Sequence, residues 1–188
     1  MGEVRWEQMG RHNVNNALAA IAAAHQVRVD PEKAVAVLNG FAGVRRRLEL
    51  RGRVNGISVY DDFAHHPTAI ATTLQGLRAR IGRRRLFAIL EPRSNTMRLG
   101  IHTDKLGPSL AAADKVFLYA PAGLDWDPRR LANAHDDLRV FRNLEEMLQV
   151  IVNQARADDH LVFMSNGGFG NIHQRVLAAL KAKEKCST

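Results

Sequence analysis

The hydrophobic and polar positions of the first 40 residues predict two helices. Residues 13–25 (NVNNALAAIAAAH) are rich in alanine and apolar on more than one face, which is typical of a buried helix opened by polar residues. A second helix is expected from Pro31 to about Leu38, since Asp30 is a favoured N-cap and Asn39-Gly40 a stop signal. Neither helix has a strand pattern beside it to pack against. We therefore expect both to be the end of a domain whose larger part lies outside this sequence.

The residues that follow predict a β-hairpin. Residues 48–54 and 57–63 are rich in apolar side chains and are separated by Asn55-Gly56. Of all residue pairs, this one best tolerates the positive φ angles that a two-residue hairpin turn requires.

After the hairpin, helix and strand patterns take turns along the chain. Such alternation implies right-handed crossovers between parallel strands. The predicted fold is therefore α/β, with a Rossmann-like, mostly parallel sheet, an amino-terminal β-hairpin and helices on both faces. Strands are expected at residues 86–90, 116–119, 139–141 and 161–164. Helices are expected at residues 67–81, 105–112, 128–134, 144–157 and 171–182.

These patterns divide the chain into three parts. Residues 1–40 are expected to end a preceding domain, residues 41–47 to form a linker, and residues 48–188 to form the carboxyl-terminal domain. A chain of 188 residues is long enough for one well-cored domain with some residues left over.

The amino-acid composition favours a globular protein over a membrane protein. Hydrophobic residues make up 46% of the chain and charged residues 24%, a balance typical of globular proteins. No window approaches the roughly 20 apolar residues of a membrane span, and the acidic start does not resemble a signal peptide. We expect a cytoplasmic protein without a membrane partner. The single cysteine, Cys186, excludes an internal disulfide.

The net charge of +8 admits a nucleic-acid partner as an alternative. Aromatic residues are only 6% of the chain and do not interleave with the arginines, so a stacking platform for single strands lacks support. Our expectation is that nucleic acid is not a partner.

Three polar segments lie where a predicted strand ends and a helix or loop begins, which is where ligands bind in parallel sheets. They are residues 60–68 (YDDFAHHPT), 91–96 (EPRSNT) and 165–170 (SNGGFG). Asp61 or Asp62 could accept hydrogen bonds from two ribose hydroxyls, or could instead cap a helix or pair with an arginine. The glycine run could hold an anion with its N–H groups, or could simply allow tight packing of helix on strand.

Adjacent histidines beside aspartates raise the alternative of a metal hydrolase built on Asp61, Asp62, His65 and His66. Neighbouring side chains point in different directions, however, so we expect at most one histidine to face the site and no metal to be held by this chain. His65 is the candidate catalytic group, as a proton donor or a phosphate contact.

Taken together, three stretches resemble the Mur ligase family. They are residues 10–20 (GRHNVNNALAA), 43–49 (GVRRRLE) and 61–68 (DDFAHHPT), in the order of the end of that family's central ATPase domain, its hinge and the start of its carboxyl-terminal domain. Residues 90–100 (LEPRSNTMRLG) and 164–174 (MSNGGFGNIHQ) resemble one branch in particular. That branch joins the tripeptide L-Ala-γ-D-Glu-meso-diaminopimelate to UDP-N-acetylmuramate in murein recycling. The branch that adds L-alanine is the nearest alternative.

The resemblance implies a role for each matching residue. Asn13 and Asn16 match asparagines that meet adenine, Arg46 a residue that lies against the base, Arg47 an arginine that reaches the phosphates, and Asp62 the ribose-binding aspartate. By their position at strand ends, the residues expected to line the peptide pocket are Arg93, Ser94, Asn95, Asn166, Gly167 and Gly168.

The resemblance also implies ATP and Mg²⁺ as cofactors. In the family, ATP phosphorylates the sugar's carboxylate, and the peptide amine attacks the resulting acyl phosphate. The family's phosphate-binding lysine loop, its magnesium-binding glutamate and its UDP-binding domain have no counterpart in this sequence. We therefore expect the remainder of the same polypeptide to be a partner, and this fragment to be inactive alone.

Overall fold

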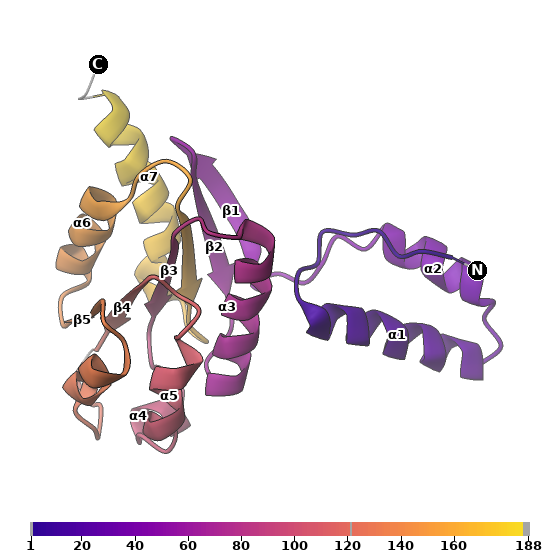
Figure 1. Ribbon diagram of the computed structural model, residues 1–188, viewed down its shortest axis with the longest axis horizontal. Coiled ribbons are helices and arrows are strands. Elements are labelled where there is room, and N and C mark those ends of the chain that lie inside the picture. Colours follow the sequence, from indigo (N-terminus) through magenta and orange to yellow (C-terminus); the bar gives the residue numbers. More distant parts are fainter. Residues whose placement is uncertain (1, 121, 186–188) are drawn as a thin grey trace. The chain divides into compact units, whose positions relative to one another are not determined.

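The computed structural model describes residues 2–120 and 122–185, and Cys186 lies outside the described residues. The chain forms two compact units, Met1–Arg45 and Arg46–Thr188 (Figure 1).

The first unit contains helices α1 (Arg11–Gln26) and α2 (Pro31–Asn39). In α2 the side chain of Asp30 accepts hydrogen bonds from the N–H groups of Glu32 and Lys33, as its position before Pro31 predicted. The prediction for α1 is wrong in two respects. The helix begins at Arg11 without a side-chain cap, and Ala17 is its only buried residue, because the unit offers α1 no sheet to pack against.

The second unit is built on a six-stranded sheet in the order β1-β2-β6-β3-β4-β5. Strands β1 and β2 form an antiparallel hairpin, and the other neighbours are parallel, so the predicted mixed α/β fold is confirmed. At the hairpin turn Asn55 has φ 53° and Gly56 φ 75°. The strands are β1 (Glu49–Val54), β2 (Ile57–Asp62), β3 (Leu86–Leu90), β4 (Lys115–Tyr119), β5 (Leu138–Phe141) and β6 (His160–Met164).

Helices cover both faces of this sheet (Figure 1). Alternate strand residues such as Phe87 and Phe163 pack with α6 and α7 in one core, and the residues between them are buried on the other face, where α3 and α5 lie. The helices are α3 (Pro67–Ile81), α4 (Asn95–Arg98), α5 (Thr103–Ser109), α6 (Leu144–Gln154) and α7 (Ile172–Lys185), with 3₁₀ turns η1 (Pro128–Ala134) and η2 (Phe169–Asn171).

Most of these bounds agree with the sequence pattern, and the differences have local causes. Helix α3 and strand β3 match their predicted bounds. Helix α6 ends at Gln154, before the predicted residue 157, because Ala155 has an extended ψ of 139°. The short helix α4 was not predicted. Within the described residues, no helix combines the length and the apolar character needed to cross a lipid bilayer.

One buried histidine lies at the amino-terminal end of β6, away from the strand ends where ligands are expected. His160 is 7% exposed, shares a hydrogen bond of 3.2 Å with the Tyr60 hydroxyl, and stacks on the Tyr60 ring. Burial lowers the pKa of His160 from 6.5, and the nearby charges of Arg84 and Arg53 lower it further. The folded state therefore favours the neutral imidazole.

This pKa shift makes stability depend on pH. Because the pKa is lower in the folded state, the contribution of His160 to stability is complete above pH 6.5 and is lost as the pH falls through the folded pKa. Urea denaturation at pH 7.5 and pH 5.5 should show a lower free energy of unfolding at pH 5.5. His160→Phe should shrink that drop, whereas Tyr60→Phe, which keeps the imidazole, should preserve it. A drop of the same size in His160→Phe would contradict this assignment.

Candidate functional site

The strand order brings the carboxyl ends of β2, β6 and β3 side by side. Asp62 is in register with Met164, and Met164 with Leu90. The backbone hydrogen bonding between these segments continues beyond the strands, since Ser165 N–H donates to Asp62 O and Glu91 N–H donates to Met164 O. The three polar segments that the sequence singled out therefore meet at one edge of the sheet.

Asp62 lies at this edge with its carboxylate almost fully buried. Oδ2 accepts from Leu48 N–H at 2.6 Å, and Oδ1 accepts from Ala64 N–H at 2.7 Å and from the Thr73 hydroxyl at 3.3 Å. Burial raises the pKa of Asp62 above 3.8, while these hydrogen bonds and the positive charge of Arg47 act in the opposite direction. A ribose hydroxyl would have to use the lone pairs that these donors leave.

Asp61, the neighbouring carboxylate, pairs with Arg46. Arg46 Nε lies 3.4 Å from Asp61 Oδ2, and the guanidinium lies over the Phe63 ring at 5.2 Å from its centroid. Arg46 Nη2 also donates to the carbonyls of Ser165 and Gly167. The pairing of one aspartate with an arginine, which the sequence left open as an alternative, thus applies to Asp61.

Arg47 is exposed, and its guanidinium carbon lies 5.7 Å from the centroid of the Phe63 ring. Its positive charge opposes the rise in the pKa of Asp62, so these two residues predicted to bind the nucleotide interact electrostatically.

The two adjacent histidines have different neighbours. His65 Nδ1 lies 2.9 Å from Phe63 O, and its ring meets the Phe63 ring edge-on. His66 is the N-cap of α3, where Nδ1 accepts from Thr68 N–H, and its ring contacts that of His102 at 4.5 Å. Within residues 2–120 and 122–185, no group of three or more His, Cys, Asp or Glu side chains is placed to hold a metal ion.

The glycine turn after β6 is held by a buried carboxylate. Ser165 Oγ donates to Glu91 Oε2 at 2.5 Å and accepts from Gly167 N–H at 2.9 Å. Glu91 is 7% exposed and Ser165 is 2% exposed. Both residues lie in the segments singled out from the sequence, but no role was predicted for either. A carboxylate directly after an apolar strand was the available signal.

Of the residues predicted to bind a peptide, Arg93 and Gly167 are in direct contact. A Cβ atom on Gly167 would lie 2.3 Å from Arg93 Cδ, so only glycine lets the arginine lie so close to the turn. Asn166 Oδ1 is buried and, within the described part of the chain, has no hydrogen-bond partner.

The other predicted peptide residues flank this contact. Ser94 is the N-cap of α4 and accepts from Met97 N–H, and Asn95 is the exposed first residue of that helix. Among the described residues, and apart from Gly168 and its two chain neighbours, no heavy atom lies within 4 Å of where a Cβ on Gly168 would be.

The predicted adenine-binding asparagines lie on α1 in the first unit. Asn16 Nδ2 lies 3.4 Å from Asn13 Oδ1, and Asn13 Nδ2 donates to Met9 O at 2.7 Å. The two amides are three positions apart and share one face of the helix.

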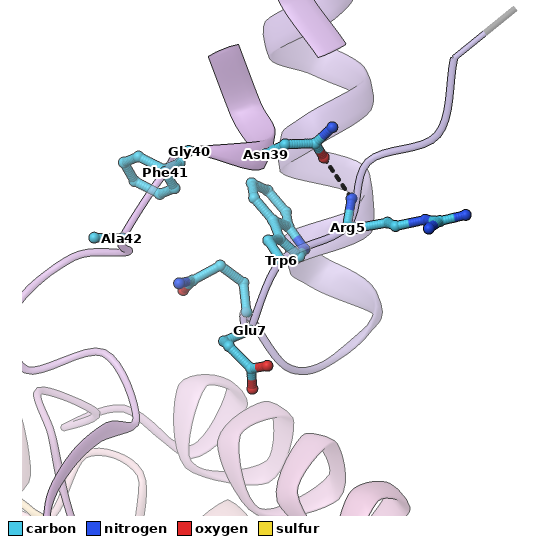
Figure 2. Close-up of a pocket in the computed structure, with 8 residues that line it drawn as sticks. Arg5, Trp6, Glu7, Asn39, Gly40, Phe41 and Ala42 are labelled. Carbon is cyan, nitrogen blue, oxygen red and sulfur yellow. Dashed lines mark hydrogen bonds between the residues drawn. The ribbon is translucent and has the colours of Figure 1, made fainter. Parts of the chain in front are cut away.

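A pocket of about 480 Å³ lies within the first unit, between residues 5–8 and 39–42. Figure 2 shows Trp6 beside the hydrogen bond from Arg5 N–H to Asn39 Oδ1. None of the residues predicted to bind a ligand lines this pocket.

Comparison with known proteins identifies relatives of the chain. Residues 46–167 match the family described as Mur ligase, glutamate ligase domain. The chain is 48% identical over 189 residues to the UDP-N-acetylmuramate-L-alanyl-γ-D-glutamyl-meso-2,6-diaminoheptandioate ligase of Escherichia coli K12, covering 100% of this chain and 41% of that protein. It is 31% identical over 192 residues to the UDP-N-acetylmuramate-L-alanine ligase of Synechococcus sp. JA-2-3B'a(2-13), covering 97% and 39%.

A solved structure gives the same indication. The crystal structure of murein peptide ligase Mpl from Psychrobacter arcticus 273-4 is 49% identical and superposes with a TM-score of 0.74, covering 95% of this chain and 38% of that one. The chain thus spans about two fifths of the curated relatives it matches.

The contacts of Asp62 give a test of the site's electrostatics. The Thr73 hydroxyl stabilises the charged carboxylate, so Thr73→Val should raise the pKa of Asp62 further. Thr72→Val is the matched control, because the Thr72 hydroxyl donates to Thr68 O on the same helix. The measurement is an NMR titration of the Asp62 carboxyl carbon. Superimposable titration curves for Thr73→Val and the unchanged protein would exclude this contact.

Proposed function

Because residues 46–167 match its family model, the chain belongs to the Mur ligase family, and we propose that it is the carboxyl-terminal part of an ATP-dependent peptide ligase. The substrates proposed are UDP-N-acetylmuramate and the tripeptide L-Ala-γ-D-Glu-meso-diaminopimelate. The observation that carries this proposal is the meeting of residues 61–66, 91–95 and 165–168 at one sheet edge, in a chain 48% identical to a ligase named for that tripeptide.

We assign residues 1–40 to the end of the central ATP-binding domain, residues 41–47 to the linker and residues 48–188 to the carboxyl-terminal domain. The division of the chain after Arg45 and the family match from residue 46 support this assignment. In this proposal the remainder of the polypeptide supplies the phosphate-binding lysine loop, the magnesium-binding glutamate and the UDP-binding domain. A cytoplasmic location fits the proposed substrates.

For the nucleotide, we propose contacts from Asn13, Asn16, Arg47 and Asp62, and the resemblance to the family adds Arg46. The chemistry of these groups suits ATP: amides pair with the edge of adenine, the carboxylate accepts from ribose hydroxyls, and an exposed guanidinium such as that of Arg47 pairs with phosphate. Mg²⁺ is assigned to no residue of this chain.

For the tripeptide, we propose a pocket at Arg93, Ser94, Asn95 and the turn Asn166-Gly167-Gly168. The exposed guanidinium of Arg93 matches the carboxylates of the tripeptide, with which it can form charge-assisted hydrogen bonds. His65 is a candidate for moving a proton at this edge.

When bound, ATP supplies the phosphoryl group that activates the sugar's carboxylate. The residues of this chain contribute by holding the nucleoside and by orienting the peptide amine, and positioning of this kind accounts for much of the rate in such reactions. The chain alone is therefore expected to bind but not to turn over.

The alanine-adding branch of the family is the second candidate, supported by 31% identity to a UDP-N-acetylmuramate-L-alanine ligase. The two candidates differ in whether residues 91–100 accept a tripeptide or a single amino acid.

The test is the release of ADP by the full-length protein in the presence of UDP-N-acetylmuramate and either the tripeptide or L-alanine. We expect turnover with the tripeptide, and none from the 188-residue chain alone. Arg93→Gln should raise KM for the tripeptide about tenfold, because a charge-assisted hydrogen bond is lost. Arg129→Gln is the matched control, since Arg129 is exposed and its ion pair among the described residues is with Asp127, two positions away.

Preference for L-alanine would assign the chain to the alanine-adding branch. An unchanged KM for the tripeptide in Arg93→Gln would remove Arg93 from the pocket.

A further inference from the structure

Arg46 connects two parts of the second unit that lie more than a hundred positions apart in sequence. Its Nη2 donates to Ser165 O at 2.7 Å and to Gly167 O at 2.6 Å. Its Nε faces Asp61 Oδ2 at 3.4 Å, and its guanidinium lies over the Phe63 ring. One side chain thus joins the end of β2 to the turn after β6.

The backbone of Arg46 is held as firmly as its side chain. Its N–H donates to Glu49 Oε2 at 2.8 Å, and its carbonyl accepts from Phe63 N–H at 2.8 Å. Its φ of 58° is a backbone angle that residues other than glycine rarely adopt. The surroundings therefore fix where the guanidinium points.

The two carbonyls that Arg46 binds bracket Asn166. On the other side of the same turn, Ser165 Oγ links Glu91 to Gly167 N–H. The turn is held between a cation and a buried carboxylate, so its shape depends on both. Removing Arg46 frees the carbonyl side, so the hydrogen bond from Gly167 N–H to Ser165 Oγ should open more readily.

We propose that Arg46 is a positioning residue for the peptide pocket: its guanidinium holds the Ser165–Gly167 turn in the shape that presents Asn166 and supports Arg93. The part of the proposal that concerns the peptide rests on the proposed function. Lysine is a poor substitute, because a compact ammonium lacks the planar fork that reaches two carbonyls and a carboxylate together.

The resemblance to the family makes a different prediction for Arg46, namely contact with the base. In the described structure its hydrogen-bond donors face the turn and Asp61, and Phe63 lies against its plane. The two roles differ in which substrate is affected when the side chain is changed.

The first experiment needs no activity and uses the 188-residue chain. Amide hydrogen exchange at Gly167 should be about tenfold faster or more in Arg46→Gln, because hydrogen bonds from a charged donor are lost. Exchange at the core residue Phe163 should be unchanged, as should exchange at Gly167 in the control Arg129→Gln. Unchanged exchange at Gly167 in Arg46→Gln, or an equal acceleration at Phe163, would overturn the proposal.

The second experiment uses the full-length ligase. We expect Arg46→Gln to raise KM for the tripeptide about tenfold and to change KM for ATP less than twofold, with partial recovery in Arg46→Lys. A rise in KM for ATP with no change for the tripeptide would show that Arg46 serves the base instead. If the unchanged enzyme does not use the tripeptide, the proposed function fails, and the exchange experiment still decides whether Arg46 holds the turn.

Discussion

The pairing of β6 with β2 on one side and β3 on the other is the interaction on which the site depends. Residues 62, 91 and 165 are far apart in sequence, and they meet because Asp62, Met164 and Leu90 lie in register across three parallel strands. Parallel strands end at the same edge of a sheet, so every polar group that follows them faces one place. The helices on both faces bury the sheet, and this edge is where we place the proposed ligand site.

The acidic and basic side chains at this edge differ in their surroundings. The carboxylates face inward: Asp62 accepts from backbone N–H groups, Glu91 from Ser165, and Asp61 pairs with Arg46. The guanidinium groups of Arg47 and Arg93 remain exposed. Hydrogen bonds offset part of the free-energy cost of burying the acids, and the charges left exposed among these groups are positive. Phosphates and carboxylates, the anionic groups of the proposed substrates, suit such an edge.

Local signals predicted much of the fold but not the contacts of the site. The Asn55-Gly56 turn, the capping of α2 and the bounds of α3 depend on nearest neighbours, and the sequence pattern located them correctly. Helix α4 spans four residues, too few for a hydrophobic period to show. The partners of Arg46 lie 119 and 121 positions away, so no local pattern could identify them. The burial expected for α1 required elements that the first unit does not contain.

Mapping ligand binding by NMR on the 188-residue chain tests most directly whether the strand ends form the binding site. Addition of the tripeptide should shift the amide signals of residues 93–95 and 166–168, because these backbone groups line the proposed pocket. The amides of Arg84 and His160, at the opposite end of the strands, should not move. Shifts confined to Arg84 and His160, or saturation without any shift at residues 93–95 and 166–168, would contradict the account.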